Sequence, residues 1–253
     1  MFSPQGPGLR ELAVQALSSV EHGYDLLAPK FDHTPFRTSD AVLDAVTRAL
    51  TGLGPFDRGL DLCCGTGAGT DVLRAVCGAG VTGVDISAGM LAQARRRELD
   101  RGAGTGSGAG TAGPSVDWVR GDARALPFGP VFDLVVSFGA FGHFLPRELP
   151  ALFAQVHAVL RPGGRFAFPI GAPPPPASPW YWALLGFDTA MRVRNALWRP
   201  PFVMYYRTFR LGDVLRALEG AGFEVGLRAL PEFGRRPDSS PRGRLVVATR
   251  AAA

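Results

Sequence analysis

The sequence predicts an α/β protein: a doubly wound, mostly parallel seven-stranded sheet with an antiparallel C-terminal strand pair and a small helical cap. The first observation is that short apolar runs alternate with stretches of helical spacing from about residue 53, which is typical of βαβ units. The second is that the last two predicted strands are separated only by a polar, proline-rich connection, which favours an antiparallel pair. With 253 residues, of which 46% are hydrophobic and 19% charged, the chain can bury a large core.

We expect residues 1–52 to form an N-terminal helical cap and residues 53–253 to form the α/β domain. Residues 9–21 have apolar side chains on one side at helical spacing, which predicts a first helix. Ser39 can cap a second helix that ends at Leu50, before Gly52.

The elements of the sheet domain follow from short apolar runs bounded by turn residues. Strands are predicted at residues 59–63, 79–84, 116–119, 132–137, 165–168, 223–227 and 244–249. Helices are predicted at residues 68–76, 87–97, about 147–160 and 211–219. Pro146 and Gly163 flank the third of these helices, as expected for helix ends.

Two segments of biased composition interrupt this alternation. Residues 101–114 are almost entirely Gly, Ala, Ser and Thr, which predicts a flexible loop without a ligand role. Four consecutive prolines begin an insert at residues 172–209, which we interpret as a lid or cap containing a helix that reaches Trp198. A helix that lies on a membrane surface is a third, less favoured interpretation, because only three arginines flank its apolar face. One stripe of that helix is polar, and we expect it to face solvent while the aromatic residues face the pocket. The stripe consists of Asp188, Arg192, Asn195 and Arg199.

Composition excludes several chemistries. Lys30 is the only lysine and no phosphate-binding loop precedes it, which excludes a Walker-type NTPase. The three cysteines and four histidines have neither C-x-x-C nor H-E-x-x-H spacing, so we expect no metal. The net charge of +5 is spread along the chain, so nucleic-acid binding is not favoured. We found neither a signal pattern nor a run of 18 apolar residues, so we expect a cytoplasmic protein without stable membrane insertion, monomeric or dimeric.

The most informative segment is residues 59–69, where a strand runs into glycines and a helix follows. Such a turn lets a ligand approach the backbone and the free N–H groups of a helix N-terminus. The dinucleotide pattern G-x-G-x-x-G fails here, because Thr70 or Val72 occupies its third glycine position. Asp61, inside the strand, suits a cationic amine better than a pyrophosphate.

Two more carboxylates follow the next strands. Asp85 comes 18 residues after Gly67, where an acidic side chain can accept hydrogen bonds from both ribose hydroxyls. Asp122 follows the third strand. All of these residues fall at the carboxyl edge of the sheet, where open α/β folds bind ligands.

The order of these motifs resembles that of class I S-adenosylmethionine-dependent methyltransferases. The matching segments cover roughly residues 59–168: Asp-Leu-Cys-Cys-Gly-Thr-Gly at 61–67, Val-Asp-Ile-Ser-Ala-Gly-Met-Leu at 84–91, Gly-Asp-Ala-Arg-Ala-Leu-Pro-Phe at 121–128 and Leu-Arg-Pro-Gly-Gly-Arg-Phe at 160–166. Residues 218–225 also resemble the family's closing strand pair. The chain departs from the family at Cys63, where glycine is common.

The resemblance implies a role for each residue of the cofactor site. Asp61 would lie near the methionine amino group of S-adenosylmethionine, and Cys63, Gly65 and Gly67 would line the cofactor through their backbone. Asp85 would bind the ribose hydroxyls, and Asp122 would accept a hydrogen bond from the adenine amine. Ile86 and Ala123 would lie beside the adenine, and Ser137 and Phe138 would face the methyl-sulfonium end.

His143 follows the fourth strand, where the family commonly has a histidine, and is either a general base or a residue that fixes the loop. We expect methyl transfer to a small acceptor of apolar or aromatic character. Its predicted contacts are Trp180, Trp182, Tyr205, Tyr206 and Arg207. Two alternatives stay open: a cofactor-binding protein of this fold with other chemistry, and a nicotinamide-dependent oxidoreductase.

Overall fold

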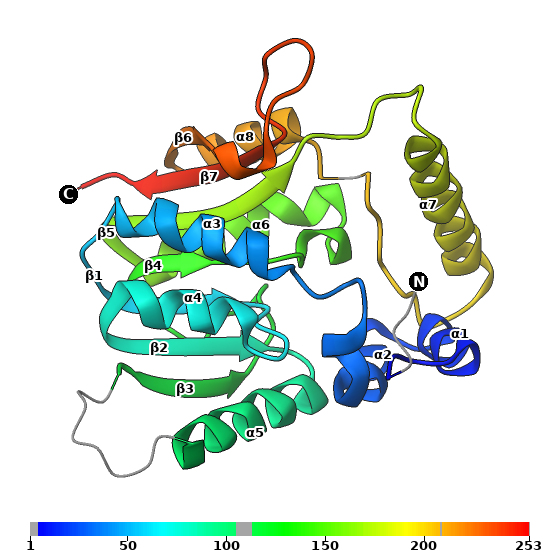
Figure 1. Ribbon diagram of the computed structural model, residues 1–253, viewed down its shortest axis with the longest axis horizontal. Coiled ribbons are helices and arrows are strands. Elements are labelled where there is room, and N and C mark those ends of the chain that lie inside the picture. The colour runs from blue at the N-terminus through cyan, green and yellow to red at the C-terminus, as the bar shows by residue number, and fades with distance from the viewer. Residues whose placement is uncertain (1–4, 105–112, 208, 253) are drawn as a thin grey trace.

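Seven strands form one sheet in the order β3-β2-β1-β4-β5-β7-β6 (Figure 1). The computed structural model describes residues 5–104, 113–207 and 209–252. The strands are β1 Phe56–Leu62, β2 Cys77–Asp85, β3 Ser115–Arg120, β4 Phe132–Val136, β5 Leu160–Gly171, β6 Phe223–Ala229 and β7 Gly243–Arg250. The first five pair in parallel, and β7 runs antiparallel to both β5 and β6, which confirms the predicted C-terminal pair.

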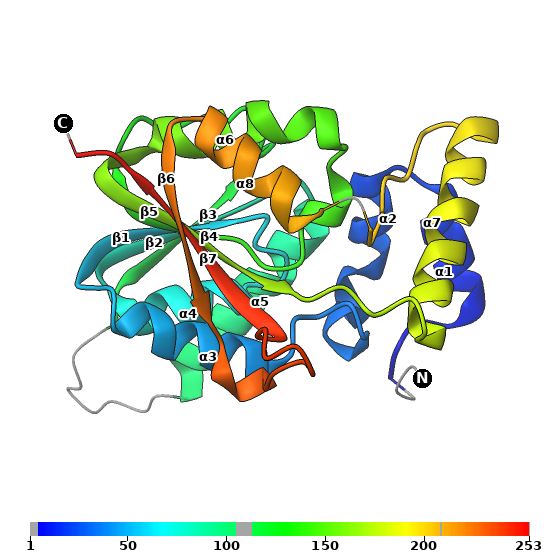
Figure 2. The same ribbon diagram turned by 90° about the horizontal axis from the view of Figure 1, so that it is seen from above.

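Helices cover both faces of the sheet. The α-helices are α1 Leu9–Leu17, α2 Val20–Leu27, α3 Asp40–Thr51, α4 Ala68–Val76, α5 Ala88–Gly104, α6 Leu149–Val159, α7 Pro179–Leu197 and α8 Leu211–Gly220. Short 3₁₀ helices are η1 Ala28–His33, η2 Phe141–His143, η3 Pro146–Glu148 and η4 Pro231–Phe233. Figure 2 shows α3, α4 and α5 on one face of the sheet and α6 and α8 on the other.

Each face of the sheet buries its own apolar core. On one face, the apolar side of α6 packs with α8 against β5, and Phe153, Phe166 and Phe168 are fully buried. On the other face, Val46 of α3 and Leu73 of α4 pack against the central strands. β1 and β4 lie between two apolar layers, so β4 is apolar apart from Asp133, and the second half of β1, residues 59–62, is fully buried.

The cap differs from the prediction in two respects. The single helix predicted over residues 9–21 is wrong: the backbone is extended at Ser18 and Ser19, and the Ser19 hydroxyl accepts from His22 N–H (3.1 Å) to begin a second helix. The expected N-terminal cap of residues 1–52 also divides, because α3 buries Val46 and Leu50 in the core of the sheet. Helices α1, α2 and α7 lie together at the end of the sheet where the parallel strands finish (Figures 1 and 2).

Helix α5 extends beyond its predicted end. The expected flexible loop began at residue 101, whereas α5 continues to Gly104 and Arg101 pairs with Asp71 of α4 (2.6 Å). Residues 105–112 of that predicted loop lie outside the described part of the chain. The ion pair joins this additional turn of α5 to α4.

Candidate functional site

Parallel pairing places the predicted site residues side by side. Leu62 of β1 lies opposite Val84 of β2, and Asp61 lies opposite Val136 of β4. The loop after β1 is fixed to β2, because Cys64 N–H donates to the Val84 carbonyl (2.9 Å). The turns that follow β1, β2 and β4 therefore meet at one edge of the sheet, as the sequence predicted.

Asp85 joins two of these turns. One carboxylate oxygen accepts from Gly65 N–H and the other from Ser87 N–H, both at 2.9 Å. Burial raises the pKa of Asp85 above its usual range. A carboxylate has about four acceptor positions, so two remain for further donors. Gly65 has a left-handed backbone (φ 54°), and a Cβ placed on it would meet nothing within 4 Å, so the loop faces open space beside this carboxylate.

Asp61 is a carboxylate with almost no exposure to solvent. It is 1% exposed, and one of its oxygens accepts from the Thr70 hydroxyl (2.9 Å). Burial raises the pKa of Asp61 to about 7. A Cβ added to Gly69 would come within 2.6 Å of Asp61 Oδ1, so the glycine loop and helix α4 pass close to this group. A bound cation would remove the cost of burying the charge.

Cys63 has a left-handed backbone, with φ of 58°. This conformation is unfavourable for residues with a Cβ and suits glycine, which gives the family's common glycine at this position a physical reason. The thiol is close to the buried carboxylates, and burial raises the pKa of Cys63 well above its usual value. The thiol is therefore protonated at neutral pH.

Replacing Cys63 by glycine and by alanine should separate the backbone strain from the loss of the thiol. Both variants lack the sulfur, but only alanine keeps the Cβ that disfavours a positive φ. We expect Cys63→Gly to be more stable than Cys63→Ala by about 1 kcal/mol. Urea unfolding of the two variants measures the difference, and equal stabilities would show that the left-handed backbone costs nothing here.

The carboxylate of Asp122 already forms an ion pair with a neighbouring arginine. Arg124 donates to both carboxylate oxygens, at 2.8–3.1 Å, and this pairing lowers the pKa of Asp122. Arg124 also reaches Glu148 (3.1 Å), while Ala123 is buried in the core. Asp122 is partly exposed, so an adenine amine would share its carboxylate with Arg124.

The residues after β4 have structural contacts of their own. Ser137 is 1% exposed, and its hydroxyl donates to the Leu62 carbonyl (2.8 Å), which joins β4 to β1. Phe138 is half-buried beside Gly69. Ile86, after β2, accepts from the Arg120 guanidinium through its carbonyl (3.2 Å). Their predicted cofactor contacts stay predictions.

His143 is held on both ring nitrogens. Nδ1 lies 2.7 Å from the Val203 carbonyl, which can only accept, so Nδ1 carries the proton. Nε2 then accepts from the Tyr24 hydroxyl at 2.7 Å. Burial lowers the pKa of His143, which keeps the imidazole neutral at pH 7, and burial raises the pKa of Tyr24. His143 thus ties both cap segments to the end of β4 and keeps a basic nitrogen on Tyr24.

The N-terminal cap binds the edge of the site through two acidic residues that the sequence analysis missed. Asp25 of α2 accepts from the Ser87 hydroxyl (2.6 Å) and Gly89 N–H (2.8 Å), at the start of α5. Asp32 of η1 accepts from the Thr66 hydroxyl in the glycine loop (2.7 Å). The partners are 34 to 64 residues apart in the chain, so no local spacing could have indicated these contacts.

The predicted orientation of the insert helix is wrong. Trp180 and Trp182 of α7 are 63% and 61% exposed, so their rings do not face the site. The polar stripe divides: Arg192 and Arg199 are exposed as predicted, whereas Asp188 and Asn195 face inward. Asp188 is 5% exposed and accepts from the backbone N–H groups of Tyr206 and Arg207. Those backbone groups lie in an irregular segment and need acceptors, which outweighs the cost of burying the carboxylate.

The remaining predicted acceptor residues differ in burial. Tyr205 is buried, and its hydroxyl accepts from Asn195 of α7 (2.9 Å). Tyr206 is 45% exposed and its ring lies 5.3 Å from that of Phe187. Arg207 stacks over Tyr181 at 4.4 Å and donates to its hydroxyl. Of the predicted set, Tyr205 alone packs in the apolar cluster next to Tyr24.

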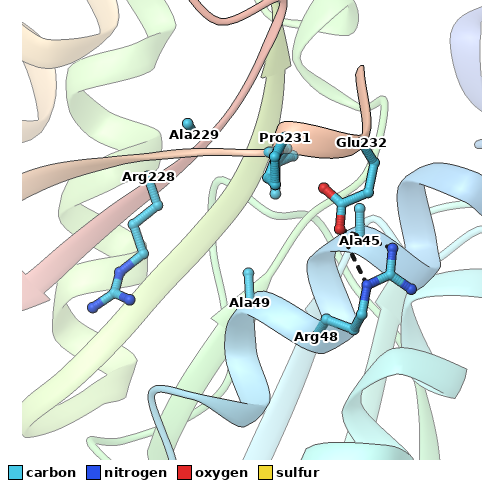
Figure 3. Close-up of a pocket in the computed structure, with 8 residues that line it drawn as sticks. Ala45, Arg48, Ala49, Arg228, Ala229, Pro231 and Glu232 are labelled. Atoms are coloured by element: carbon cyan, nitrogen blue, oxygen red, sulfur yellow. Dashed lines mark hydrogen bonds and ion pairs between the residues drawn. The ribbon is translucent and has the colours of Figure 1, made fainter. Parts of the chain in front are cut away.

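A separate groove of about 450 Å³ lies between α3 and the segment after β6 (Figure 3). Arg48 of α3 pairs there with Glu232 of η4 (2.9 Å), and Arg228 points away from this pair. None of the predicted site residues lines this groove. Both partners are exposed to solvent, so the ion pair contributes little to stability.

The sheet order, the glycine loop and the acidic residues at the carboxyl ends of β1, β2 and β3 define a Rossmann-like α/β fold with a candidate ligand site at this edge of the sheet. The family model described as "Methyltransferase domain" matches residues 60–164. An uncharacterised methyltransferase from Synechocystis is 37% identical over 46% of this chain and 47% of its own length. A 2-phytyl-1,4-naphtoquinone methyltransferase from Synechococcus elongatus is 31% identical over 62% of this chain and 65% of its own length.

The chain therefore spans about half to two thirds of the length of these curated relatives. Among solved structures, a SAM-dependent methyltransferase from Methanosarcina mazei superposes with a TM-score of 0.58 at 19% identity, over 79% of this chain and 95% of that one. This likeness confirms the fold. Residues 60–164 therefore match a methyltransferase domain, and the chain is similar in sequence and fold to S-adenosylmethionine-dependent methyltransferases.

Proposed function

We propose that the protein transfers a methyl group from S-adenosylmethionine to a small acceptor of apolar or aromatic character. The observation that carries this proposal is the arrangement of Asp61, Gly65 and Asp85. Two carboxylates that are costly to bury flank a glycine loop that faces open space. When bound, S-adenosylmethionine supplies the methyl group and a neutral thioether leaves.

The carboxylates match the polar groups of that donor. Asp85 has acceptor positions left for two ribose hydroxyls, and Asp61 would pair with the ammonium group. Cys63, Gly65 and Gly67 would line the donor with backbone, Asp122 would bind the adenine amine, and Ile86, Ala123, Ser137 and Phe138 would complete the contacts. Because the sulfonium loses its charge in the reaction, most of the rate enhancement would come from holding the acceptor in line and excluding water.

Tyr24 and His143 provide a route for a proton. An oxygen or carbon acceptor must lose a proton, and the Tyr24 hydroxyl already donates to a neutral imidazole. In the proposed step, Tyr24 Oη accepts the acceptor's proton while its own proton moves to His143 Nε2. The resulting imidazolium is stabilised by its Nδ1–H bond to the Val203 carbonyl. His143 is then the general base and also holds the loop, which unites the two roles considered from the sequence.

The surroundings of Tyr24 favour an apolar or aromatic acceptor. Its ring lies 6.1 Å from Phe31 and 6.4 Å from Phe202, and an apolar cluster of Met191, Phe202 and Tyr205 packs against it. The naphthoquinone named for the Synechococcus relative is an acceptor of this kind. Aromatic walls of this type bind flat rings with little loss of side-chain entropy.

Thermal-shift measurements test the donor, and mass spectrometry tests the transfer. S-adenosylhomocysteine should raise the melting temperature, whereas NADH should not. A panel of reduced naphthoquinones and phenols incubated with S-adenosylmethionine should yield products heavier by one methyl group. Stabilisation by NADH alone would support an oxidoreductase, and stabilisation by S-adenosylhomocysteine without a methylated product from any acceptor class would support other chemistry on this fold.

The raised pKa of Asp61 predicts how cofactor binding depends on pH. With a pKa of about 7, Asp61 is mostly protonated at pH 6, and an ammonium ligand must drive out that proton. Affinity for S-adenosylhomocysteine should therefore rise about eightfold from pH 6 to pH 7.5, and fall above pH 8 as the ligand's amino group deprotonates. Calorimetry in buffers of different ionisation enthalpy should detect proton release near pH 7.

Asp61→Asn is the matched variant, because it keeps the shape without the titrating proton. Its affinity should be lower and flat between pH 6 and 7.5, and a flat wild-type profile would remove Asp61 from the amine site. The raised pKa of Asp61 also affects the stability of the protein without a ligand. Because the pKa is higher in the folded state than in the unfolded state, the ligand-free protein should lose stability as pH rises from about 4 to about 7.

A further inference from the structure

Helix α7 uses its polar side chains to hold the cap together. Asp188 accepts from two backbone N–H groups of the following segment, at 2.8 and 3.0 Å. Asn195 donates to the Phe202 carbonyl (3.0 Å) and accepts from Phe202 N–H (2.8 Å). Because these groups face inward, the opposite side of the helix is left to its apolar residues.

The outward side of α7 is almost free of charge. The structure describes every residue of this helix, and of its twelve exposed positions Arg192 alone is charged and Thr189 is the other polar one. We call the following residues the cap face: Trp180, Trp182, Phe187, Val193, Leu197 and Trp198, whose exposures range from 37% to 81%. An ordinary surface helix has the reverse pattern, and an exposed apolar surface of this kind marks a contact site.

The charge around the cap face is positive. From residue 149 to residue 212 Asp188 is the only acidic residue, and it is buried and hydrogen-bonded. Residues 172–210 contain five arginines, of which Arg192, Arg199 and Arg210 are exposed. Exposed tryptophans beside arginines are typical of helices that lie in the headgroup region of a bilayer, and the positive charge complements anionic lipids.

The cap face lies on the back of the elements that border the proton route. On its inner side, Met191 packs with Phe202 and Tyr205 against Tyr24. Tyr205 N–H donates to the Gly142 carbonyl (2.8 Å), next to His143. Figure 2 shows α7 at the outer edge of the molecule, beside α1 and α2. A surface docked on the cap face would thus be one helix away from the acceptor end of the proposed site.

We propose that the cap face docks on the surface of an anionic phospholipid bilayer, from which the protein takes an acceptor dissolved in the lipid. Among residues 5–104, 113–207 and 209–252, no helix is long and apolar enough to cross a bilayer, so α7 would lie in the interface. The docking is independent of the reaction, whereas the origin of the acceptor rests on the proposed methyl transfer.

Vesicle co-sedimentation of the full chain tests the docking. The probe is vesicles of phosphatidylcholine and phosphatidylglycerol at a ratio of 3:1, with pure phosphatidylcholine for comparison. Val193→Glu/Leu197→Glu places two like charges on the cap face at exposed side chains, 53% and 81%, that carry no polar group. We expect at least a tenfold loss of binding to the anionic vesicles, and weaker wild-type binding to phosphatidylcholine.

The control is Leu99→Glu/Leu227→Glu, which adds the same charge at exposed leucines on α5 and β6 (72% and 43%). It should bind vesicles within twofold of wild type. Equal loss in both double variants, or wild-type vesicle binding that Val193→Glu/Leu197→Glu leaves intact, would overturn the proposal. The proposal would also be overturned if the wild type did not bind vesicles and formed a dimer in analytical ultracentrifugation that Val193→Glu/Leu197→Glu dissociates. A second copy of the chain would then cover the cap face.

Two readouts separate this proposal from the proposed function. Affinity for S-adenosylhomocysteine should be unchanged in Val193→Glu/Leu197→Glu, because the donor site is elsewhere. If vesicles bind and no acceptor is methylated, docking stands and the reaction fails. Both proposals stand if this variant methylates a water-soluble acceptor as fast as the wild type does, but methylates the same ring on a lipid tail in vesicles at least fivefold more slowly. If the variant and the wild type methylate the lipid-bound acceptor at equal rates, delivery from the membrane is overturned.

Discussion

Asp85→Ala should bind S-adenosylhomocysteine about ten- to a hundredfold more weakly than the wild type. Two hydroxyls donating to a buried carboxylate contribute about 1.5–3 kcal/mol, and alanine removes both bonds. The variant also frees Gly65 N–H, which Asp85 holds at 2.9 Å, so the glycine loop loses a support on its ligand side. Isothermal titration calorimetry measures the loss directly.

Two further measurements give this expectation a control. Asp85→Asn keeps an acceptor for Gly65 N–H but loses the charge, so its affinity should lie between those of wild type and Asp85→Ala. Asp133→Ala removes an aspartate of the same sheet that accepts from Asp57 and Arg58 N–H at the other ends of the strands, and should leave ligand affinity unchanged. Wild-type affinity in a folded Asp85→Ala would exclude Asp85 from the site.

The sheet and the cluster of Asp61, the glycine loop and Asp85 at its carboxyl edge were predictable because their signals are local. The apolar runs of β1 and β4 and the glycines after β1 are read from neighbouring residues, and parallel strands bring their carboxyl ends together whatever the loops do. Asp61 and Asp85 were therefore placed without knowledge of any contact between them. The left-handed backbone of Cys63 is different, because only the departure from glycine pointed to that position.

The cap was not predictable in the same way. The spacing of Asp188 and Asn195 located a stripe on α7, but a helical period does not say which side of the helix is inside. The answer depends on backbone donors at Phe202, Tyr206 and Arg207, which lie in an irregular segment without sequence periodicity. The bond between Tyr24 and His143 joins residues 119 positions apart, and nothing in either local sequence indicates the other.

His143→Gln should lower methyl transfer to an oxygen or carbon acceptor by about 10²–10⁴-fold, the usual contribution of a general base. Glutamine can donate to the Val203 carbonyl and accept from the Tyr24 hydroxyl, as His143 does in the wild type, but it cannot take up a proton. The cap should therefore stay attached, and melting temperature and S-adenosylhomocysteine affinity should stay near wild type. His157→Gln, at a half-buried position in the last turn of α6 beside Phe223, is the matched control and should keep full turnover.

Tyr24→Phe tests whether the proton passes through the hydroxyl. Phenylalanine keeps the ring contacts with Phe31 and Phe202 and removes the group that lies 2.7 Å from His143. If Tyr24 relays the proton, its loss of turnover should approach that of His143→Gln, and the double variant should be no slower than either single one. Full turnover in Tyr24→Phe with loss in His143→Gln would make His143 the direct base.

The pH profile gives an independent check on the charge state of His143. Because burial lowers its pKa, the imidazole is neutral and competent as a base at pH values below the usual histidine pKa. Wild-type kcat/KM for an acceptor without titrating groups should therefore stay level from pH 8 down to below 6.5 once binding through Asp61 is saturated with donor. An acidic limb that begins above pH 6.5 would contradict a neutral, buried His143. Full turnover in both Tyr24→Phe and His143→Gln would mean that the acceptor loses no proton to the protein. The acceptor would then be an amine or a thiolate. Tyr24 and His143 would have only a structural role, which is to hold α2 and the segment at Val203 to the end of β4.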